Sequence, residues 1–377
     1  MRANSRNLSA SFYVLQKNDV LLKNIIRSER FDNEYIEIIN HYFNTLDNII
    51  DIDINNEKRI KSIIEALKNM WVKKHLKSTT FLIFEDFNDF ENNLFKLPSY
   101  RGHFIHQFNV FLLGYFILNK LLHNERVKNI FRINSTEMNF TWMLASTFHD
   151  MGYPIEKIGE LVRLYFDMFL KVETNYDINI ENILTYNFYN YIQYLAEFHY
   201  IIDRLQENRW NLYTSNKKLD FKFQDKLLNK LRKKDHGTIS SILLLHSLLT
   251  KEKLVNMENW INRDLPFWIM PACHAISLHT FTHKEIQIKF EKFPFAFLLS
   301  LCDELQDWGR SLNEKDHSTL RGISIDENDD IPEIIINITC NNNNKYKNIK
   351  KLKKKLKCNS IKVRILVDND PEKTICI

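Results

Sequence analysis

The chain has 377 residues, of which 44% are hydrophobic and 13% aromatic, so it is long and apolar enough to bury a large core. Its 7 Gly and 7 Pro argue against a loop-rich β-sandwich or a glycine-rich dinucleotide-binding fold, and they favour a mostly α protein. The net charge of +5 is local, because eight lysines lie between Lys345 and Lys357, and it does not indicate a surface that is basic throughout and suited to nucleic acid.

The cysteine pattern and the hydropathy favour a soluble cytoplasmic protein. Five cysteines without a Cys-x-x-Cys pair fit a reducing compartment and no thiolate metal cluster. Cys273 and Cys302 lie in apolar runs, which predicts small core residues. The first 21 residues lack the apolar core of a signal peptide, and the longest apolar runs are too short to span a bilayer. We therefore expect no membrane contact.

Helical periodicity starts in the N-terminal region, which we place at residues 1–99. Apolar residues recur at helical spacing from about Phe31 to Lys77 and predict two amphipathic helices. A long apolar helix follows and runs to about Leu122. His103 and His106 share a face of it. Either histidine could be a core residue bonded to a carbonyl, so the pair alone does not define a site.

The stretch from Thr141 to Pro154 is the centre of the prediction. Asn139 is the expected N-cap of an apolar helix, and Gly152 with Pro154 is expected to end it. His149 and Asp150 then lie at the buried end of this helix. A buried carboxylate is costly without a cation or several donors, and a divalent metal accepts both imidazole and carboxylate ligands.

Three further helices carry candidate ligands after an expected helical insertion at about 155–235, in which His199 is predicted to be structural. His236 follows Asp235 at a helix start. His274 and His279 are five residues apart, about 140° around a helix, so they cannot both point at one centre. Asp303 ends an apolar run and shares a face with Asp307 and Arg310. The simpler alternative for that face is a helix entering solvent with an Asp307–Arg310 ion pair.

Composition changes at residue 331 and predicts a small basic β-α-β appendage over 331–377. Two β-branched runs, Ile334–Thr339 and Ile361–Val367, flank the lysine-rich segment from Lys345 to Lys357, whose narrow apolar stripe predicts a helix. Its lysines are expected to face solvent rather than nucleic acid, because only Tyr346 could serve as an exposed aromatic platform.

In its order of motifs, the region from about Tyr100 to Arg310 resembles the HD superfamily of metal-dependent phosphohydrolases. Arg101 and His106-x-x-x-Val110 resemble the first motif, and Phe148-His-Asp-Met-Gly152 the second. Asp235-His236-Gly237, Ala275-Ile-x-x-His279 and Leu301-Cys-Asp303 resemble the later ones. The resemblance implies a helical HD-type domain at 100–330. Tyr153-Pro154 after Gly152 and Thr280-Phe281 after His279 depart from the cyclic-dinucleotide-cleaving members, so a cyclic dinucleotide is not indicated as substrate.

The resemblance also implies a ligand set and a reaction. His106, His149, Asp150 and Asp303 would hold one divalent ion (Mn, Fe, Zn or Ni, with Mg possible). Asp150 would bridge to a second ion on His236 and His279, with His274 or His103 as further candidates. Asp150 would thus be central to catalysis, and Arg101 and Arg310 would clamp phosphate, since a guanidinium presents paired donors.

Three functions follow as hypotheses. The first is a phosphohydrolase or phosphodiesterase acting on a nucleotide or another small phosphate through a metal-activated water. The second is a nucleotide-binding sensor that does not turn over. The third, ranked lowest, is a nuclease that uses the lysine-rich helix to hold a strand.

Overall fold

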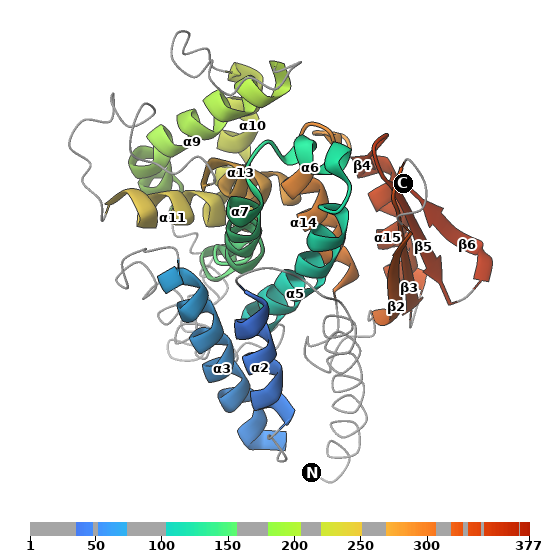
Figure 1. The fold of residues 1–377 in the computed structure, drawn as a ribbon. Helices are drawn as coiled ribbons and strands as arrows, with labels where there is room; N and C mark the ends of the chain where they lie inside the picture. The colour runs from blue at the N-terminus through green and yellow to red at the C-terminus, as the bar shows by residue number, and fades with distance from the viewer. Residues whose placement is uncertain are drawn as a thin grey trace, which may run out of the picture.

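Helices dominate the protein and strands gather near its C-terminus, which confirms the predicted mostly α class (Figure 1). The computed structural model describes residues 35–47, 52–73, 103–156, 180–204, 220–250, 269–306, 318–326, 331–340, 343–368 and 370–377. The helices in these ranges are α2 (Ile36–Asp47), α3 (Ile52–Lys73), α5 (His103–Leu121), α6 (Glu125–Phe131), α7 (Ser135–Phe148), α9 (Ile180–Arg204), α10 (Phe221–Arg232), α11 (His236–Thr250), α13 (Ile269–His279), α14 (Pro294–Leu305) and α15 (Asn343–Lys355).

The centre of the molecule is a bundle of helices that are apolar on nearly all sides. Nearly every residue of α5 and every residue of α13 is buried. Helix α13 packs against α7, α11 and α14, while α5 packs against α7 and α14. Helices without a polar face are stable only when neighbours surround them, so the sequence of these elements dictates their central position. The predicted N-terminal pair, α2 and α3, packs together and contacts α5 through α3.

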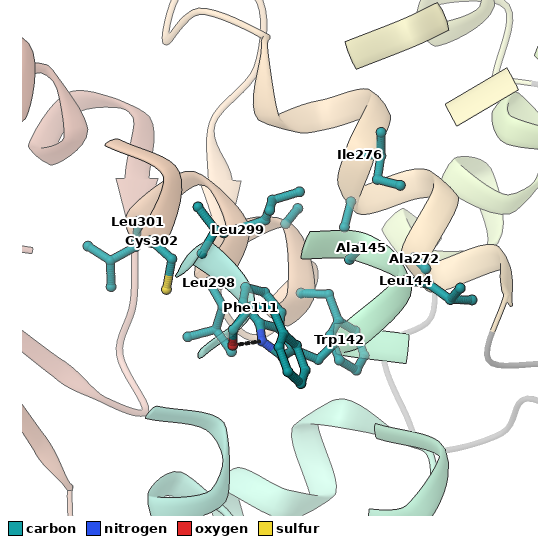
Figure 2. Close-up of a cluster of buried hydrophobic side chains, with 14 of the residues drawn as sticks. Phe111, Trp142, Leu144, Ala145, Ala272, Ile276, Leu298, Leu299, Leu301 and Cys302 are labelled. Carbon is teal, nitrogen blue, oxygen red and sulfur yellow. Dashed lines mark hydrogen bonds between the residues drawn. The ribbon is translucent and has the colours of Figure 1, made fainter. Parts of the chain in front are cut away.

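One tryptophan ties helix α7 to α5 inside the central bundle. Figure 2 shows Trp142 of α7 in the cluster of buried side chains that also includes Leu298 of α14, and the indole Nε1 donates to the Phe111 carbonyl of α5 at 2.9 Å. Gly114 makes this approach possible, because a Cβ there would lie 1.9 Å from the Trp142 ring. Replacing such a fully buried tryptophan by alanine costs about 3–5 kcal/mol.

Helix α7 begins one turn earlier than predicted. Asn134 is its N-cap, and its side chain accepts from the Glu137 backbone N–H at 2.8 Å. The prediction of Asn139 as N-cap was therefore wrong. Asn139 lies inside the helix and accepts from the Asn119 amide at 3.3 Å. Apolar periodicity did not indicate this start, because the N-cap and the polar first turn come before the first run of apolar residues.

We call the strands β2 to β6 with α15 the C-terminal module. Its four-stranded sheet has the order β2-β3-β5-β6, in which β3 and β5 are parallel and the outer strands antiparallel. The predicted β-α-β unit is present as β3, α15 and β5. The flanking β2 and β6 were not predicted, and β2 places the start of the sheet before residue 331. The strands are β2 (Ser318–Asp326), β3 (Glu333–Cys340), β5 (Lys362–Val367) and β6 (Asp370–Cys376).

A second, two-stranded pairing joins the module to the helical bundle. Strand β4 (Leu356–Lys357) pairs in parallel with β1 (Ile288–Lys289), which lies between α13 and α14. Helix α15 consequently ends at Lys355 rather than at the predicted Lys357. Among the described helices, none is both long and apolar enough to cross a membrane.

Candidate metal centre

Six side chains from five helical segments converge at one end of the central bundle. In three overlapping groups, the candidate ligand atoms lie within 4.8 Å of one another. The convergence is a tertiary effect, since His106 and Asp303 are 197 residues apart in the chain. The groups are His106, His149 and Asp150; His149, His279 and Asp303; and Asp150, His236 and His279.

The end of α7 places His149 and Asp150. The helix ends at Phe148 with His149 as C-cap, so the chain turns while both side chains remain buried. Gly152 lets α11 approach this turn, because a Cβ there would lie 2.4 Å from the His236 carbonyl oxygen. Its backbone N–H donates to Ser240 Oγ at 2.7 Å. Gly152, predicted only as a helix stop, thus brings His236 to Asp150.

Asp235 joins the start of α11 to the end of α13. Its Oδ1 accepts from the Thr238 backbone N–H at 3.0 Å, as an N-cap does, and from Thr280 Oγ1 at 2.7 Å. The two helix ends therefore meet, and the rings of His236 and His279 lie 5.4 Å apart between centroids.

Two carboxylates lie among the four imidazoles. His106 Nε2 is 2.9 Å from Asp303 Oδ1 and 3.8 Å from Asp150 Oδ2. His149 Nε2 is 3.5 Å from both of these carboxylate oxygens, and His236 Nε2 is 3.5 Å from Asp150 Oδ1. The Nε2 atoms of all three rings therefore face Asp150 or Asp303.

The other ring nitrogen of each histidine is bonded outward. The partner of each Nδ1 is an oxygen, which accepts the Nδ1 hydrogen. When such a ring is neutral, as a metal ligand must be, Nδ1 keeps the hydrogen and Nε2 presents a lone pair. The acceptors are Gln306 Oε1 for His106, the Ser146 carbonyl for His149 at 2.7 Å, Glu156 Oε2 for His236 at 2.8 Å and the Ile276 carbonyl for His279 at 2.6 Å.

These lone pairs fit a cation. The Nε2 atoms of His149 and His279 are buried and make no hydrogen bond among the described residues. The lone pair of a neutral imidazole that faces a carboxylate oxygen needs a proton or a metal ion between the two, and imidazole with carboxylate is a ligand set for divalent transition metals. The buried cluster is therefore compatible with a metal site.

The charges within the cluster are also compatible with a bound cation. Burial alone would raise the pKa of Asp150 and of Asp303, but the surrounding histidines hold both pKa values well below the usual range. Burial lowers the pKa of His236, yet Glu156 and Asp150 outweigh it and raise that pKa to about 9. Burial, with His149 and His236, lowers the pKa of His279 to about 3. Both acids are thus carboxylates at neutral pH.

The centre opens on one side into a cavity of about 410 Å³. The side chains of His106 and His149 are 0% exposed, whereas those of His236 and Asp303 are 25% and 27% exposed. The side of α11 and α14 is therefore the open side of the cluster. The cavity is lined by Glu156, Lys230, Lys233, Asp235, His236, His279, Thr280 and Asp303.

The remaining predicted residues either do not join the three groups or lie outside the described residues. The ring of His103 contacts that of Tyr153 in a tilted arrangement, with 4.0 Å between centroids, and the charge of His103 lowers the pKa of Asp150, but His103 belongs to none of the three groups. His274 does not join the centre and instead contacts His199, with 2.9 Å between the ring nitrogens. Arg101, Asp307 and Arg310 lie outside the described residues.

Several residues of the site were not predicted from the sequence. Gln306 could have been found, since it follows Asp303 by three residues and so shares its helix face. Glu156 lies beyond the expected helix stop, and Lys230 and Lys233 lie on an ordinary amphipathic helix, α10, and at its C-cap. Only the tertiary structure directs these three toward the centre.

Comparison with known proteins does not add to this description: no family model, curated protein or solved structure matches the chain.

Proposed function

We propose that the protein is an HD-type metal-dependent phosphohydrolase that cleaves a phosphoester or phosphoanhydride bond of a nucleotide or another small phosphate. The observation that carries the proposal is the shared orientation of the site histidines. Each bonds outward through Nδ1, and the Nε2 atoms of His106, His149 and His236 face two carboxylates beside a cavity lined by lysines. The order of the motifs along the chain supports the same assignment.

Two ions are assigned to the six side chains. His106, His149, Asp150 and Asp303 would hold one, and Asp150, His236 and His279 the other. The nitrogen-rich set favours Mn, Fe, Zn or Ni over Mg. Such ions lower the pKa of a bound water toward neutrality and offset charge that develops on a phosphoryl oxygen.

The protein's own residues have distinct tasks in this proposal. Glu156 holds the Nδ1 hydrogen of His236 and so directs Nε2 toward Asp150. Lys230 is bonded to the Thr280 carbonyl at 3.0 Å and forms a fixed wall of the cavity. Lys233 is exposed at the cavity, where its ammonium group would receive a phosphate. Arg101 and Arg310 remain predicted phosphate clamps.

The experiment combines metal content with turnover. Purified protein, as isolated and after loading with Mn²⁺, Fe²⁺, Zn²⁺, Ni²⁺ or Mg²⁺, is analysed by elemental analysis and assayed for phosphate release from nucleoside mono-, di- and triphosphates. Cleavage of bis(p-nitrophenyl) phosphate reports diesterase activity. We expect bound transition metal and metal-dependent cleavage of at least one substrate.

The other outcomes separate the alternatives. Turnover that persists after Asp150→Ala would exclude this mechanism. Thermal stabilisation by nucleotides without product under any metal would favour the nucleotide-binding sensor. Cleavage confined to DNA or RNA, with salt-dependent binding, would favour the nuclease.

A further inference from the structure

The end of helix α13, which carries His279, is held by two lysines from other parts of the chain. Lys355, the last residue of α15, donates to the His279 carbonyl oxygen, and Lys230 of α10 donates to the Thr280 carbonyl oxygen at 3.0 Å. The last carbonyls of a helix lack partners within it and form the negative end of its dipole. Cations at these carbonyls therefore stabilise the last turn of α13.

The Lys355 ammonium group is partly buried and interacts electrostatically with acids of α14. Desolvation lowers the pKa of Lys355 to about 8, and the charges of Asp303 and Glu304 act in the opposite direction. The charge of Lys355 is thus part of the electrostatic surroundings of Asp303, one of the candidate ligands. Lys355 follows His279 by 76 residues in the chain, so this interaction depends on the tertiary structure.

Contacts on both sides of Lys355 fix its position. Lys345, in the first turn of α15, donates to Glu304 Oε1 at 3.0 Å and holds the helix against α14. Directly after Lys355, Leu356 pairs with Ile288, and the Lys357 carbonyl accepts from the Phe290 N–H at 2.8 Å. The C-terminal module is therefore mounted on the bundle so that Lys355 meets the end of α13.

The orientation of the His279 imidazole depends on that same helix end. Its Nδ1 donates to the Ile276 carbonyl at 2.6 Å, within the last turn. If the turn frayed, this hydrogen bond and the direction of Nε2 would be lost together. The support given by Lys355 thus acts on the ligand through the backbone and requires no contact with the metal itself.

We propose that the C-terminal module is a structural part of the metal centre, and that Lys355 is the positioning residue through which it orients His279. The inference rests on the proposed function in one respect, that His279 is a metal ligand. Partners of ligating histidines change metal affinity by roughly 10–100-fold when they are removed, and we expect an effect of that size here.

The test compares Lys355→Met with Lys354→Met in the full chain. Lys354 is the exposed neighbour on the same helix and is the matched control. Affinity for Zn²⁺ is measured by chelator competition, the visible spectrum of the Co²⁺ form reports ligand geometry, and hydrogen exchange of the 278–281 amides is followed in the metal-free protein. We expect Lys355→Met to lower Zn²⁺ affinity about 10–100-fold, to change the Co²⁺ spectrum and to speed exchange at 278–281. Lys354→Met should change none of these.

A second variant covers the case in which Lys355→Met does not fold. Lys355→Arg keeps the charge with a different donor geometry and should lower Zn²⁺ affinity severalfold. Wild-type affinity and spectrum in whichever of the two variants folds would overturn the proposal. If the wild-type chain binds no metal, the proposed function fails. The positioning role of Lys355 is then decided by hydrogen exchange of the 278–281 amides alone, and exchange rates that the substitution leaves unchanged would overturn that role.

Discussion

Helix α13 carries two buried histidines in two different surroundings. His279 lies at its end among two carboxylates and three other imidazoles, with Nδ1 bonded to a carbonyl. His274 lies five residues earlier and contacts His199, whose ring stacks on Phe223 at 3.8 Å between centroids. Both rings are nearly inaccessible. Burial therefore does not distinguish a candidate ligand from a structural histidine.

The neighbours of each ring make the distinction. The pKa of His274 is held well below its usual value by burial and by the charge of His199, so His274 is a neutral ring that shares one hydrogen bond. At the candidate metal centre the pKa of His279 is also lowered, to about 3, but there the charges of Asp303 and Asp150 act in the opposite direction. Carboxylates of the same cluster raise the pKa of His149 and of His236. A cluster that attracts a cation thus combines acids facing Nε2 with acceptors on Nδ1.

The largest effect is expected from Asp150→Asn, because Asp150 is the one carboxylate among the three residues that belong to two ligand groups, so its loss removes both a shared ligand and a negative charge. We expect metal affinity to fall by at least about 100-fold, more than for loss of an outer partner, with turnover abolished. Elemental analysis and phosphate release measure the two losses. Asp225→Asn, at an exposed acid on α10, is the control and should retain both.

The comparison on α13 is tested directly by His279→Ala and His274→Gln. We expect the first to lower metal affinity by about 100-fold and the second to leave it within about threefold, since only His279 belongs to a ligand group. Isothermal titration with Zn²⁺ gives both values. Equal losses in the two variants would show that α13 responds to any substitution in its core.

A smaller loss is expected when an outer partner is changed. Glu156→Gln keeps the shape but removes the carboxylate that accepts from His236 Nδ1. Metal affinity should fall about 10–100-fold while the protein remains folded. Chelator competition beside thermal unfolding checks this result, and an unchanged affinity would mean that the negative charge of Glu156 does not support His236 as a ligand.

The smallest effect is expected in the pH dependence of the free energy of unfolding that arises from His274, the buried partner of His199. Because the folded pKa of His274 lies below its unfolded value of 6.5, the unfolded state binds more protons under acid conditions. The free energy of unfolding therefore falls as pH drops below about 6.5, by up to ~1.4 kcal/mol per pH unit for this group. Urea unfolding of metal-free protein at pH 7 and pH 5.5 should show a weaker fall in His274→Gln. Parallel falls in both proteins would contradict the assignment.

The sequence predicted the features that local pattern determines. The apolar run after His106 located α5, and Asp235-His236-Gly237 was correctly expected to start a helix, which is α11. The six residues that the HD resemblance implied as ligands are brought together by the structure, while their role as ligands stays a prediction. The first turn of α7 was missed because cap chemistry at Asn134 comes before any apolar signal.

Features that arise from contacts between distant segments were not predictable. Lys230, Lys233 and Lys355 have sequence surroundings like those of any solvated lysine, and only packing places them beside the centre. Strand β2 mixes charged and apolar residues and was recognised only through its pairing with β3. The sequence indicates that Gly152 ends a helix. Its role in allowing α11 to approach with His236 becomes visible only in the tertiary structure.

The dependence of α13 on α15 and β4 has a consequence for biogenesis. A ribosome makes the chain from its N-terminus, so His279 and Asp303 leave the exit tunnel before Lys355 and the partner strand of β1 have been synthesised. A nascent polypeptide at that stage lacks the proposed support for the end of α13. We therefore expect the centre to mature late, after α15 and β4 have been translated.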